Sequence, residues 1–254
     1  MEINLSLGSA LPTKNPFRAM ELGVHASDPV FGPIGLKQVQ LCPQNGPMQL
    51  TESVIDELQE TYPNTTFRLH ANARLLERPV LFDLGSMPRY SEYKAALVRT
   101  LKVLKSPYSI HAAIGKNAPT PAVQFGRLKD LEDAAGVPIG LEGLYPGGAN
   151  VFSTWADYAL LLDAGVHFAV DLSHLNIIRH HEGPAPDGLV EALLIHPLCM
   201  EVHLSGNDGR RDSHEAVKPG IWWEALLGGI NKDATVFYEG RQRHVENINN
   251  KGAA

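Results

Sequence analysis

Short apolar runs alternate along the chain with stretches in which apolar residues recur every three or four positions. The short runs predict β-strands, and the longer period predicts amphipathic helices. We expect eight strands, at Ile3–Leu7, Leu36–Leu41, Thr66–His70, Tyr108–His111, Pro138–Leu141, His167–Val170, Cys199–Leu204 and Thr235–Tyr238. We expect helices at Asn15–Val24, Glu52–Thr61, Ser91–Lys105, Pro121–Ala135, Phe152–Ala164, Asp187–Ile195 and Ile221–Gly228, and a short stub after Arg243.

Strands that alternate with helices form a parallel sheet. Six of the eight strands end in polar or charged residues, which favours closure into a (β/α)8 TIM barrel, because such barrels carry their chemistry at that end. An open doubly wound sheet would normally have a Gly-rich phosphate loop after its first strand, and Gly8-Ser9-Ala10 is a poor match. The chain shows no repeat or linker, and its 254 residues fit one barrel of about 250. We therefore expect residues 1–254 to form a single α/β TIM barrel domain.

The composition is that of an ordinary soluble protein, with 44% hydrophobic and 20% charged residues. No window approaches the roughly 18 unbroken apolar residues of a membrane helix, and the first residues lack the basic region of a signal peptide. The two cysteines, Cys42 and Cys199, lie far apart and form no paired motif. We expect a reduced, cytoplasmic protein that does not bind membranes. The net charge of −6 argues against a dedicated nucleic-acid-binding surface.

Histidine, aspartate and glutamate residues gather at the ends of the predicted strands. One such residue carries little information, because a lone histidine in a strand is more often a core or surface residue. Nine of them, spread in order over six strand-like segments, would converge on one mouth of a barrel. The nine candidate metal ligands are His70, His111, Glu142, Asp171, His174, His203, Asp212, His214 and Glu239. Their order predicts a metalloenzyme.

The spacing of these residues agrees with a shared site. Asp171 and His174 are three residues apart, so they cannot point to the same face of one strand. We expect Asp171 to close its strand and His174 to reach back from the loop or from the first turn of a helix. Asp212 and His214 are two residues apart, so both can face one ion from an extended loop.

Five imidazoles and four carboxylates exceed the roughly four ligands that one zinc ion takes. Bridging carboxylates would let the set hold two or three divalent ions, for which zinc, manganese and iron are all candidates. Such a cluster stabilises both the attacking and the leaving oxygen of a displacement. We expect Glu142, Asp171 and Glu239 to be the catalytic carboxylates.

The nine residues, in order and approximate spacing, resemble the ligand set of the endonuclease IV family of xylose-isomerase-like TIM barrels. The matching segments, between residues 66 and 241, are FRLHANA, YSIHAAIG, IGLEGL, AVDLSH, EVHLSGNDGRRDSHEAVKPG and VFYEGR. The resemblance implies three zinc ions and cleavage of phosphodiesters at abasic DNA sites. It also implies the distribution of the ligands: Glu142 as the bridge, with His70 and His111 on one ion; Asp171, His203 and Glu239 on a second; His174, Asp212 and His214 on the third.

Two segments depart from that family. Ala71-Asn72-Ala73-Arg74 stands where the family has a DNA-intercalating Tyr-Leu pair, and Gly143-Leu144 stands where it has Asn-Thr. We therefore expect a small anionic or phosphorylated substrate rather than duplex DNA. The sequence does not indicate an oligomeric state.

Basic residues are frequent in the segments that follow the strands. Nine of the 22 basic residues lie there, namely Arg74, Arg78, Lys116, Arg179, Arg210, Arg211, Lys218, Arg241 and Arg243. A ring of cations around the mouth of an acidic protein suits an anionic substrate. The residues that we expect to bind substrate are Arg74, Lys116, Arg210, Arg211 and Arg241, with Arg210 and Arg211 as the main clamp.

The leading hypothesis is a multinuclear metal-dependent hydrolase that acts on a phosphoester as a phosphodiesterase. A second hypothesis is a sugar isomerase or epimerase with one Mn²⁺ or Mg²⁺ ion. There, Glu142, Asp171, His203 and Glu239 would hold the ion, while Glu142 and Glu239 moved protons between adjacent carbons. Such an enzyme would not need the other five ligands in full. A third hypothesis is an iron-dependent oxidase that modifies peptides, because the same side chains also bind iron.

Overall fold

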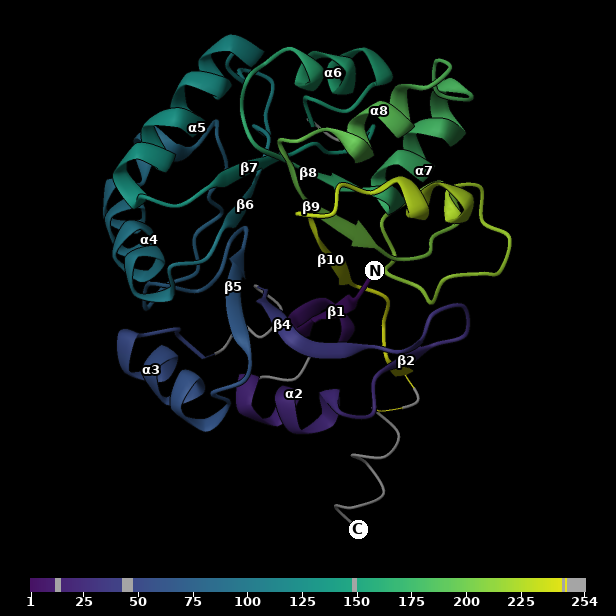
Figure 1. Cartoon of the computed structure of the whole chain (residues 1–254). Coiled ribbons are helices and arrows are strands. Elements are labelled where there is room, and N and C mark those ends of the chain that lie inside the picture. The colour runs from purple at the N-terminus through teal and green to yellow at the C-terminus, as the bar shows by residue number, and fades with distance from the viewer. Residues whose placement is uncertain (12–14, 43–47, 148–149, 244, 246–254) are drawn as a thin grey trace.

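The computed structural model of the protein describes residues 1–11, 15–42, 48–147, 150–243 and 245. Eight parallel strands form a closed barrel in the order β1-β10-β9-β8-β7-β6-β5-β4 (Figure 1). The barrel strands are β1 (Ile3–Ser6), β4 (Gly35–Leu41), β5 (Thr66–His70), β6 (Tyr108–His111), β7 (Ile139–Glu142), β8 (Phe168–Asp171), β9 (Cys199–Leu204) and β10 (Thr235–Tyr238). The (β/α)8 TIM barrel predicted from the sequence is confirmed.

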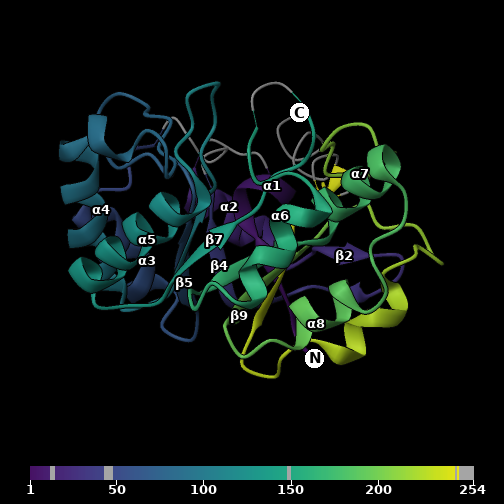
Figure 2. The ribbon, with the colours of Figure 1, turned by 90° about the horizontal axis from the view of Figure 1, so that it is seen from above.

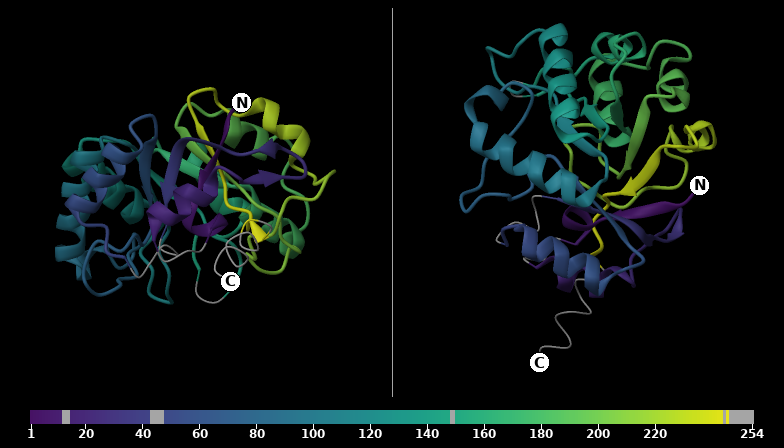
Figure 3. Two further views of the ribbon diagram at one scale, coloured as in Figure 1. Left: turned by 90° about the horizontal axis from the view of Figure 1, so that it is seen from below. Right: turned by 60° about the vertical axis from the view of Figure 1, so that its left-hand side comes forward.

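Helices surround the barrel on its outside, except for the short helix after β1, which lies at one end of the barrel (Figure 1 and Figure 2). They are α1 (Leu7–Ala10), α2 (Pro16–Gly23), α3 (Glu52–Thr61), α4 (Ser91–Leu104), α5 (Pro121–Ala135), α6 (Trp155–Ala159), α7 (Leu172–Glu182) and α8 (Leu189–Ile195). Single 3₁₀ segments lie at η2 (Met87–Arg89), η3 (Leu160–Leu162) and η4 (Glu224–Gly229). The two longest helices, α4 and α5, pack side by side against the same part of the barrel (Figure 3).

Three helical predictions differ from the structure. Helix α7 was not predicted; it starts directly at the end of β8, where the Asp171 carboxylate accepts hydrogen bonds from the N–H groups of Ser173 and His174. The helix predicted from Phe152 begins only at Trp155, because Phe152 has a φ of +63° and Thr154 caps the first turn. The helix predicted at Ile221–Gly228 is the 3₁₀ segment η4.

Two short strands lie outside the barrel. Strands β2 (Ser27–Asp28) and β3 (Gly32–Pro33) form a small antiparallel sheet that the sequence did not predict. The stub predicted after Arg243 lies almost entirely outside the described residues. Within the described part of the chain, no helix is both long enough and apolar enough to cross a membrane.

The strands are buried on both faces. All six residues of β9 are buried, and Glu201 and His203 alternate along it with Val202 and Leu204. In a strand, such alternation puts the two polar residues on the face opposite the two apolar ones. On β9, the polar face carries Glu201 and His203, and Phe237 of the neighbouring strand packs against the His203 ring.

The polar residues at the strand ends share one end of the barrel. Seen across the barrel, the N-terminus that leads into β1 and the helix α1 that directly follows β1 lie at opposite ends (Figure 2). Because all eight strands are parallel, the segments after every strand lie at the α1 end. The candidate ligands are therefore brought together from β5, β6, β7, β8, β9 and β10.

Candidate metal centre

A pocket of about 230 Å³ opens at the carboxyl ends of the strands. Eight of the nine candidate ligands line it, and the ninth, His203, is fully buried next to them. The remaining lining residues are Ile114, Leu144, Tyr145 and Asn150. The structure thus brings together side chains that are spread over some 170 positions of the sequence.

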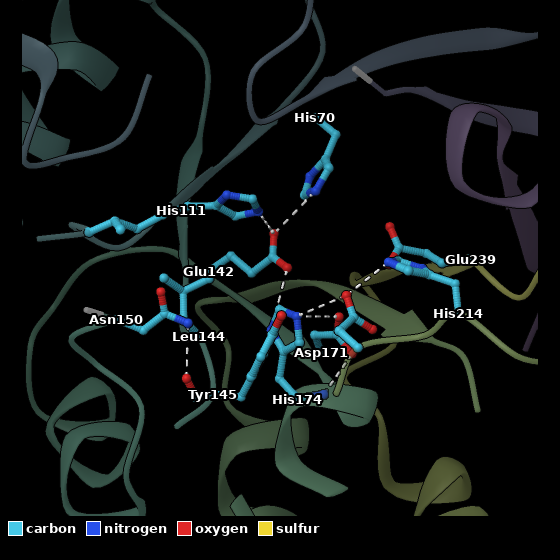
Figure 4. Close-up of a pocket in the computed structure, with 12 residues that line it drawn as sticks. His70, His111, Glu142, Leu144, Tyr145, Asn150, Asp171, His174, His214 and Glu239 are labelled. Carbon is cyan, nitrogen blue, oxygen red and sulfur yellow. Dashed lines mark hydrogen bonds and ion pairs between the residues drawn. The ribbon is translucent and has the colours of Figure 1, made fainter. Parts of the chain in front are cut away.

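Glu142 stands at the centre of this pocket (Figure 4). Its Oε2 atom lies 3.5 Å from His70 Nε2 and 3.7 Å from His111 Nε2. Its Oε1 atom lies 3.4 Å from His203 Nδ1 and 3.9 Å from His174 Nδ1. The two oxygens therefore face different groups of imidazoles, which is the arrangement of a carboxylate that bridges two cations.

A second group of ligands surrounds Asp212. His214 Nε2 lies 2.8 Å from Asp212 Oδ2, and His174 Nε2 lies 3.7 Å from the same oxygen. His174 Nε2 is also 3.3 Å from Asp171 Oδ2. His214 Nδ1 faces Glu239 Oε2 at 3.7 Å, which links this group to the last strand.

Local backbone structure orients His174. Asp171 ends β8 and caps α7, so His174 lies in the first turn of that helix, one of the two positions that the three-residue spacing allowed. The Nδ1–H group of His174 donates a hydrogen bond to the Gly143 carbonyl at 2.9 Å. Nε2 is therefore the nitrogen left to bind a cation.

The segment that carries Asp212 and His214 is also fixed. The Ser173 hydroxyl donates to Asp212 Oδ1 at 3.2 Å, and the Arg241 N–H donates to the His214 carbonyl at 2.8 Å. His214 adopts a φ of +46°, a conformation that is strained for a residue with a side chain. Strain of this kind is common where a binding site requires one particular side-chain direction.

Below the pocket, polar side chains support His203. The Gln40 amide nitrogen lies 3.2 Å from His203 Nε2 and donates to Glu201 Oε1 at 3.3 Å. Arg68 pairs with the same carboxylate, with its Nη1 3.7 Å from Glu201 Oε1. Arg68 and Glu201 lie two residues before His70 and His203, so they form a layer directly beneath two candidate ligands.

The histidines fall into two electrostatic classes. Burial lowers the pKa of His70 to about 3, although the Glu142 carboxylate acts in the opposite direction. Burial also lowers the pKa of His111. For His174, burial is outweighed by Asp171 and Asp212, which raise its pKa to about 10. For His214, burial is likewise outweighed, chiefly by Asp212, and its pKa rises to about 9.

Buried polar atoms without partners indicate that these residues fit cations. In the described part of the chain, Glu142 Oε2, His203 Nδ1 and His214 Nδ1 are buried and have no hydrogen-bond partner. Such atoms normally cost free energy unless something satisfies them. Three overlapping groups, each with ligand atoms within 4.8 Å of one another, are His70 with His203 and Glu239, His70 with His111 and Glu142, and Glu142 with Asp171 and His203.

The five basic residues predicted to bind substrate do not line this pocket. Arg74 is half-buried and donates to the Glu77 carbonyl, and the other four are exposed. Arg211 faces a neighbouring cavity instead. The four exposed residues are Lys116, Arg210, Arg211 and Arg241.

Four mouth residues were missed by sequence reasoning. Ile114 and Tyr145 each lie three positions after a candidate ligand, and Leu144 and Asn150 belong to the loop after β7. Their closeness in sequence to His111 and Glu142 is the only signal that could have marked them, because loop direction is not encoded in a periodic pattern.

No protein-family model and no curated protein matches the sequence. The structure is similar to a D-tagatose 3-epimerase-like protein, with a TM-score of 0.64, 16% identity and 100% of both chains covered. It is similar to an L-ribulose 3-epimerase, with a TM-score of 0.63, 15% identity and coverage of 100% of this chain and 87% of that one. Endonuclease IV from Thermus thermophilus has a TM-score of 0.54 and 18% identity, with 98% of this chain and 96% of that one covered. These likenesses show a TIM-barrel fold that this chain shares with epimerases and an endonuclease.

Proposed function

We propose that this barrel is a multinuclear metal-dependent hydrolase that cleaves a phosphoester in a small substrate. The observation that carries the proposal is the position of Glu142. One of its oxygens faces the Nε2 atoms of His70 and His111, and the other faces the unpartnered Nδ1 atom of His203. A carboxylate shared in this way fits two adjacent cations, and a single-cation enzyme has no need of it.

The cations, when bound, supply Lewis-acid stabilisation of the attacking and leaving oxygens of a displacement. The chain holds them with imidazole and carboxylate ligands whose directions are fixed by hydrogen bonds. His70 Nδ1 lies 2.8 Å from the Ser109 hydroxyl, and His174 Nδ1 donates to the Gly143 carbonyl. Each bond leaves the opposite ring nitrogen facing the pocket.

The mouth of the pocket sets the size of the substrate. Tyr145 lies with its ring 4.8 Å from the ring of His174, and the apolar side chains of Ile114 and Leu144 complete the rim. A volume of about 230 Å³ admits a phosphorylated small molecule or the end of a flexible chain. We propose a small anionic ester as the substrate class, with the Asn150 amide as a neutral polar contact at the rim.

Metal analysis combined with a phosphodiesterase assay tests this proposal. We expect two to three zinc ions per chain and hydrolysis of bis(p-nitrophenyl) phosphate. His174→Ala and Asp212→Ala should each abolish hydrolysis while the far-ultraviolet circular dichroism stays unchanged. His181→Ala, an exposed histidine on α7, is the matched control and should retain full activity. Full turnover in His174→Ala would contradict the multinuclear assignment.

Sugar epimerisation is the second candidate. Glu142 and Glu239 flank His203, with their Oε1 atoms 3.4 and 3.9 Å from its Nδ1 atom. Two carboxylates around one ion suit proton transfer on both sides of a carbon centre. Purification with one manganese ion, and exchange of a sugar C–H proton with solvent deuterium, would favour this function. Iron with a visible absorbance would favour the peptide-modifying oxidase instead.

A further inference from the structure

A second cavity lies beside the metal centre, lined by Asn176 of α7 and by residues of the segment that follows β9. Its volume is about 370 Å³, larger than that of the metal pocket. The two cavities share a wall made of residues 211–215. Asp212 and His214 line the metal pocket, whereas Arg211, Ser213 and Glu215 line the second cavity. Alternate residues of this loop therefore face opposite cavities.

The walls of this second cavity are fixed by hydrogen bonds. Gly206 and Glu215 exchange backbone hydrogen bonds of 2.8 and 2.7 Å, which hold the two ends of the loop together. The Asn176 amide donates to Asn207 Oδ1 at 2.8 Å and accepts from the Trp222 indole N–H at 2.9 Å. These bonds tie the loop to α7, so the cavity exists before any ligand binds.

Two cations that line the cavity form no salt bridge. Among the described residues, neither Arg211 nor Lys218 forms an ion pair, and both line the cavity. The acidic lining residues are already engaged. Glu215 pairs with Arg243 at 2.9 Å, and Asp208 accepts the backbone N–H of Arg210 at 3.0 Å. Asp208 also attracts the Arg211 guanidinium, but the two form no salt bridge. The cationic lining groups available to a ligand are therefore the Arg211 guanidinium and the Lys218 ammonium group.

We infer that this cavity is a second anion-binding site, which takes a carboxylate or phosphate group through Arg211 and Lys218. A guanidinium binds planar oxyanions with two parallel hydrogen bonds, and a lysine adds a point charge from another direction. The site goes beyond the proposed hydrolysis, because it lies on the other side of the 211–215 wall from the candidate metal ligands.

Calorimetric titration of the metal-free full-length protein tests this inference. Inorganic phosphate and succinate are titrated separately, and the tighter of the two identifies the preferred anion. Arg211→Gln and Lys218→Gln should each weaken binding by about tenfold or more. Arg210→Gln removes a neighbouring exposed charge that lines neither cavity, and His70→Ala removes a metal ligand on the far side of the pocket.

Both controls should bind the anion within a factor of about two of the unaltered protein. An equal loss in Arg210→Gln would show a diffuse charge effect and would overturn the site. Loss of binding in His70→Ala would place the anion in the metal pocket and would also overturn it. The absence of saturable binding by both anions would have the same consequence. None of these outcomes depends on hydrolytic activity, so the test separates this site from the proposed function.

Discussion

Gly143 is the first residue after β7, at the mouth of the pocket. A Cβ atom at this position would lie 2.5–2.6 Å from the Tyr158 ring and hydroxyl, and that ring is fully buried. The Gly143 carbonyl accepts the hydrogen bond that orients the His174 ring. The absence of a side chain at Gly143 therefore serves both the packing around α6 and the direction of a candidate ligand.

Gly143→Ala should lower the free energy of unfolding by about 1–3 kcal/mol, the usual cost of overpacking a core. It should also weaken zinc binding, because the carbonyl that fixes His174 must move. Chemical denaturation and zinc titration measure the two effects. Gly126→Ala is the matched control: a Cβ atom there meets nothing within 4 Å, and the residue lies inside α5. That control should raise stability by up to about 1 kcal/mol; equal destabilisation in both variants would refute the packing argument.

The raised pKa values of His174 and His214 predict proton release on zinc binding. With pKa values of about 10 and 9, both rings are protonated in the metal-free protein near neutral pH. A cation requires the neutral ring, so it must displace these protons, whereas His70, with a pKa of about 3, releases none. The affinity for zinc should therefore fall as the pH is lowered from 8 to 6.

Calorimetry in two buffers of different ionisation enthalpy counts the released protons. We expect at least two protons per chain at pH 7, because the Glu142 and Glu239 carboxylates outweigh burial and also raise the pKa of His203. His214→Ala should release about one proton fewer. A binding enthalpy that is the same in both buffers would show that no proton leaves, and would contradict the assignment of these two rings as ligands.

At the scale of the elements, the barrel strands could be predicted from the sequence, whereas the helices and loops between them were predicted less accurately. Most barrel strands are buried on both faces and several are short, largely apolar runs, such as Phe168–Asp171. Helix α7 escaped prediction because it follows β8 with no breaking residue between them, and because four of its first seven residues are apolar without a clear exposed face. Two other helices begin later than predicted, because a residue near the predicted start has a positive φ. These residues are Phe152 before α6 and Gly188 before α8.

The candidate ligands were predictable for the same reason as the strands. A residue at the end of a barrel strand has its place fixed by the sheet, so Glu142 and Asp171 could be placed without coordinates. The basic residues lie in loops, where the direction of a side chain depends on the path of the backbone. Arg211 illustrates this, because it is one position from a candidate ligand and yet faces a different cavity.

The layer beneath the ligands predicts a difference between two kinds of substitution. Arg68 and Glu201 are buried, and Arg68 Nη2 also donates to Thr235 Oγ1 at 2.6 Å. Arg68→Met leaves the Glu201 carboxylate without its cation and should cost about 3–5 kcal/mol, as the breaking of a buried pair does. The double variant Arg68→Met, Glu201→Gln removes both charges and should recover much of that loss.

Chemical denaturation of the single and double variants measures this coupling, and zinc titration of the double variant isolates the role of Glu201. If the carboxylate only balances Arg68, the double variant should bind zinc normally. If it also holds His203, zinc affinity should fall by about 10–100-fold, the usual effect of removing a group that supports a ligand. Equal stability of the single and double variants would contradict the buried ion pair.

At the scale of the whole molecule, the barrel and the metal centre have separate sources of stability. Apolar residues from every barrel strand and from the larger helices form one continuous core outside the site. The charged candidate ligands at the mouth do not belong to that core. Their carboxylates lie close together, and without a cation they repel one another. We therefore expect the chain to fold without metal and to gain stability from metal, because cations bind the folded state and have no preformed site in the unfolded chain.

Removal of metal by chelation should lower the melting temperature without abolishing the cooperative transition. A ligand at about a thousand times its dissociation constant adds about 4 kcal/mol, which in a chain of this size corresponds to on the order of 10 °C. Glu142→Gln should lose most of this gain, because it removes the charge that two groups of imidazoles share. His181→Ala should keep it. Differential scanning calorimetry with and without zinc measures the shift; a melting temperature that does not respond to zinc, manganese or iron would show that these ligands do not form a metal centre.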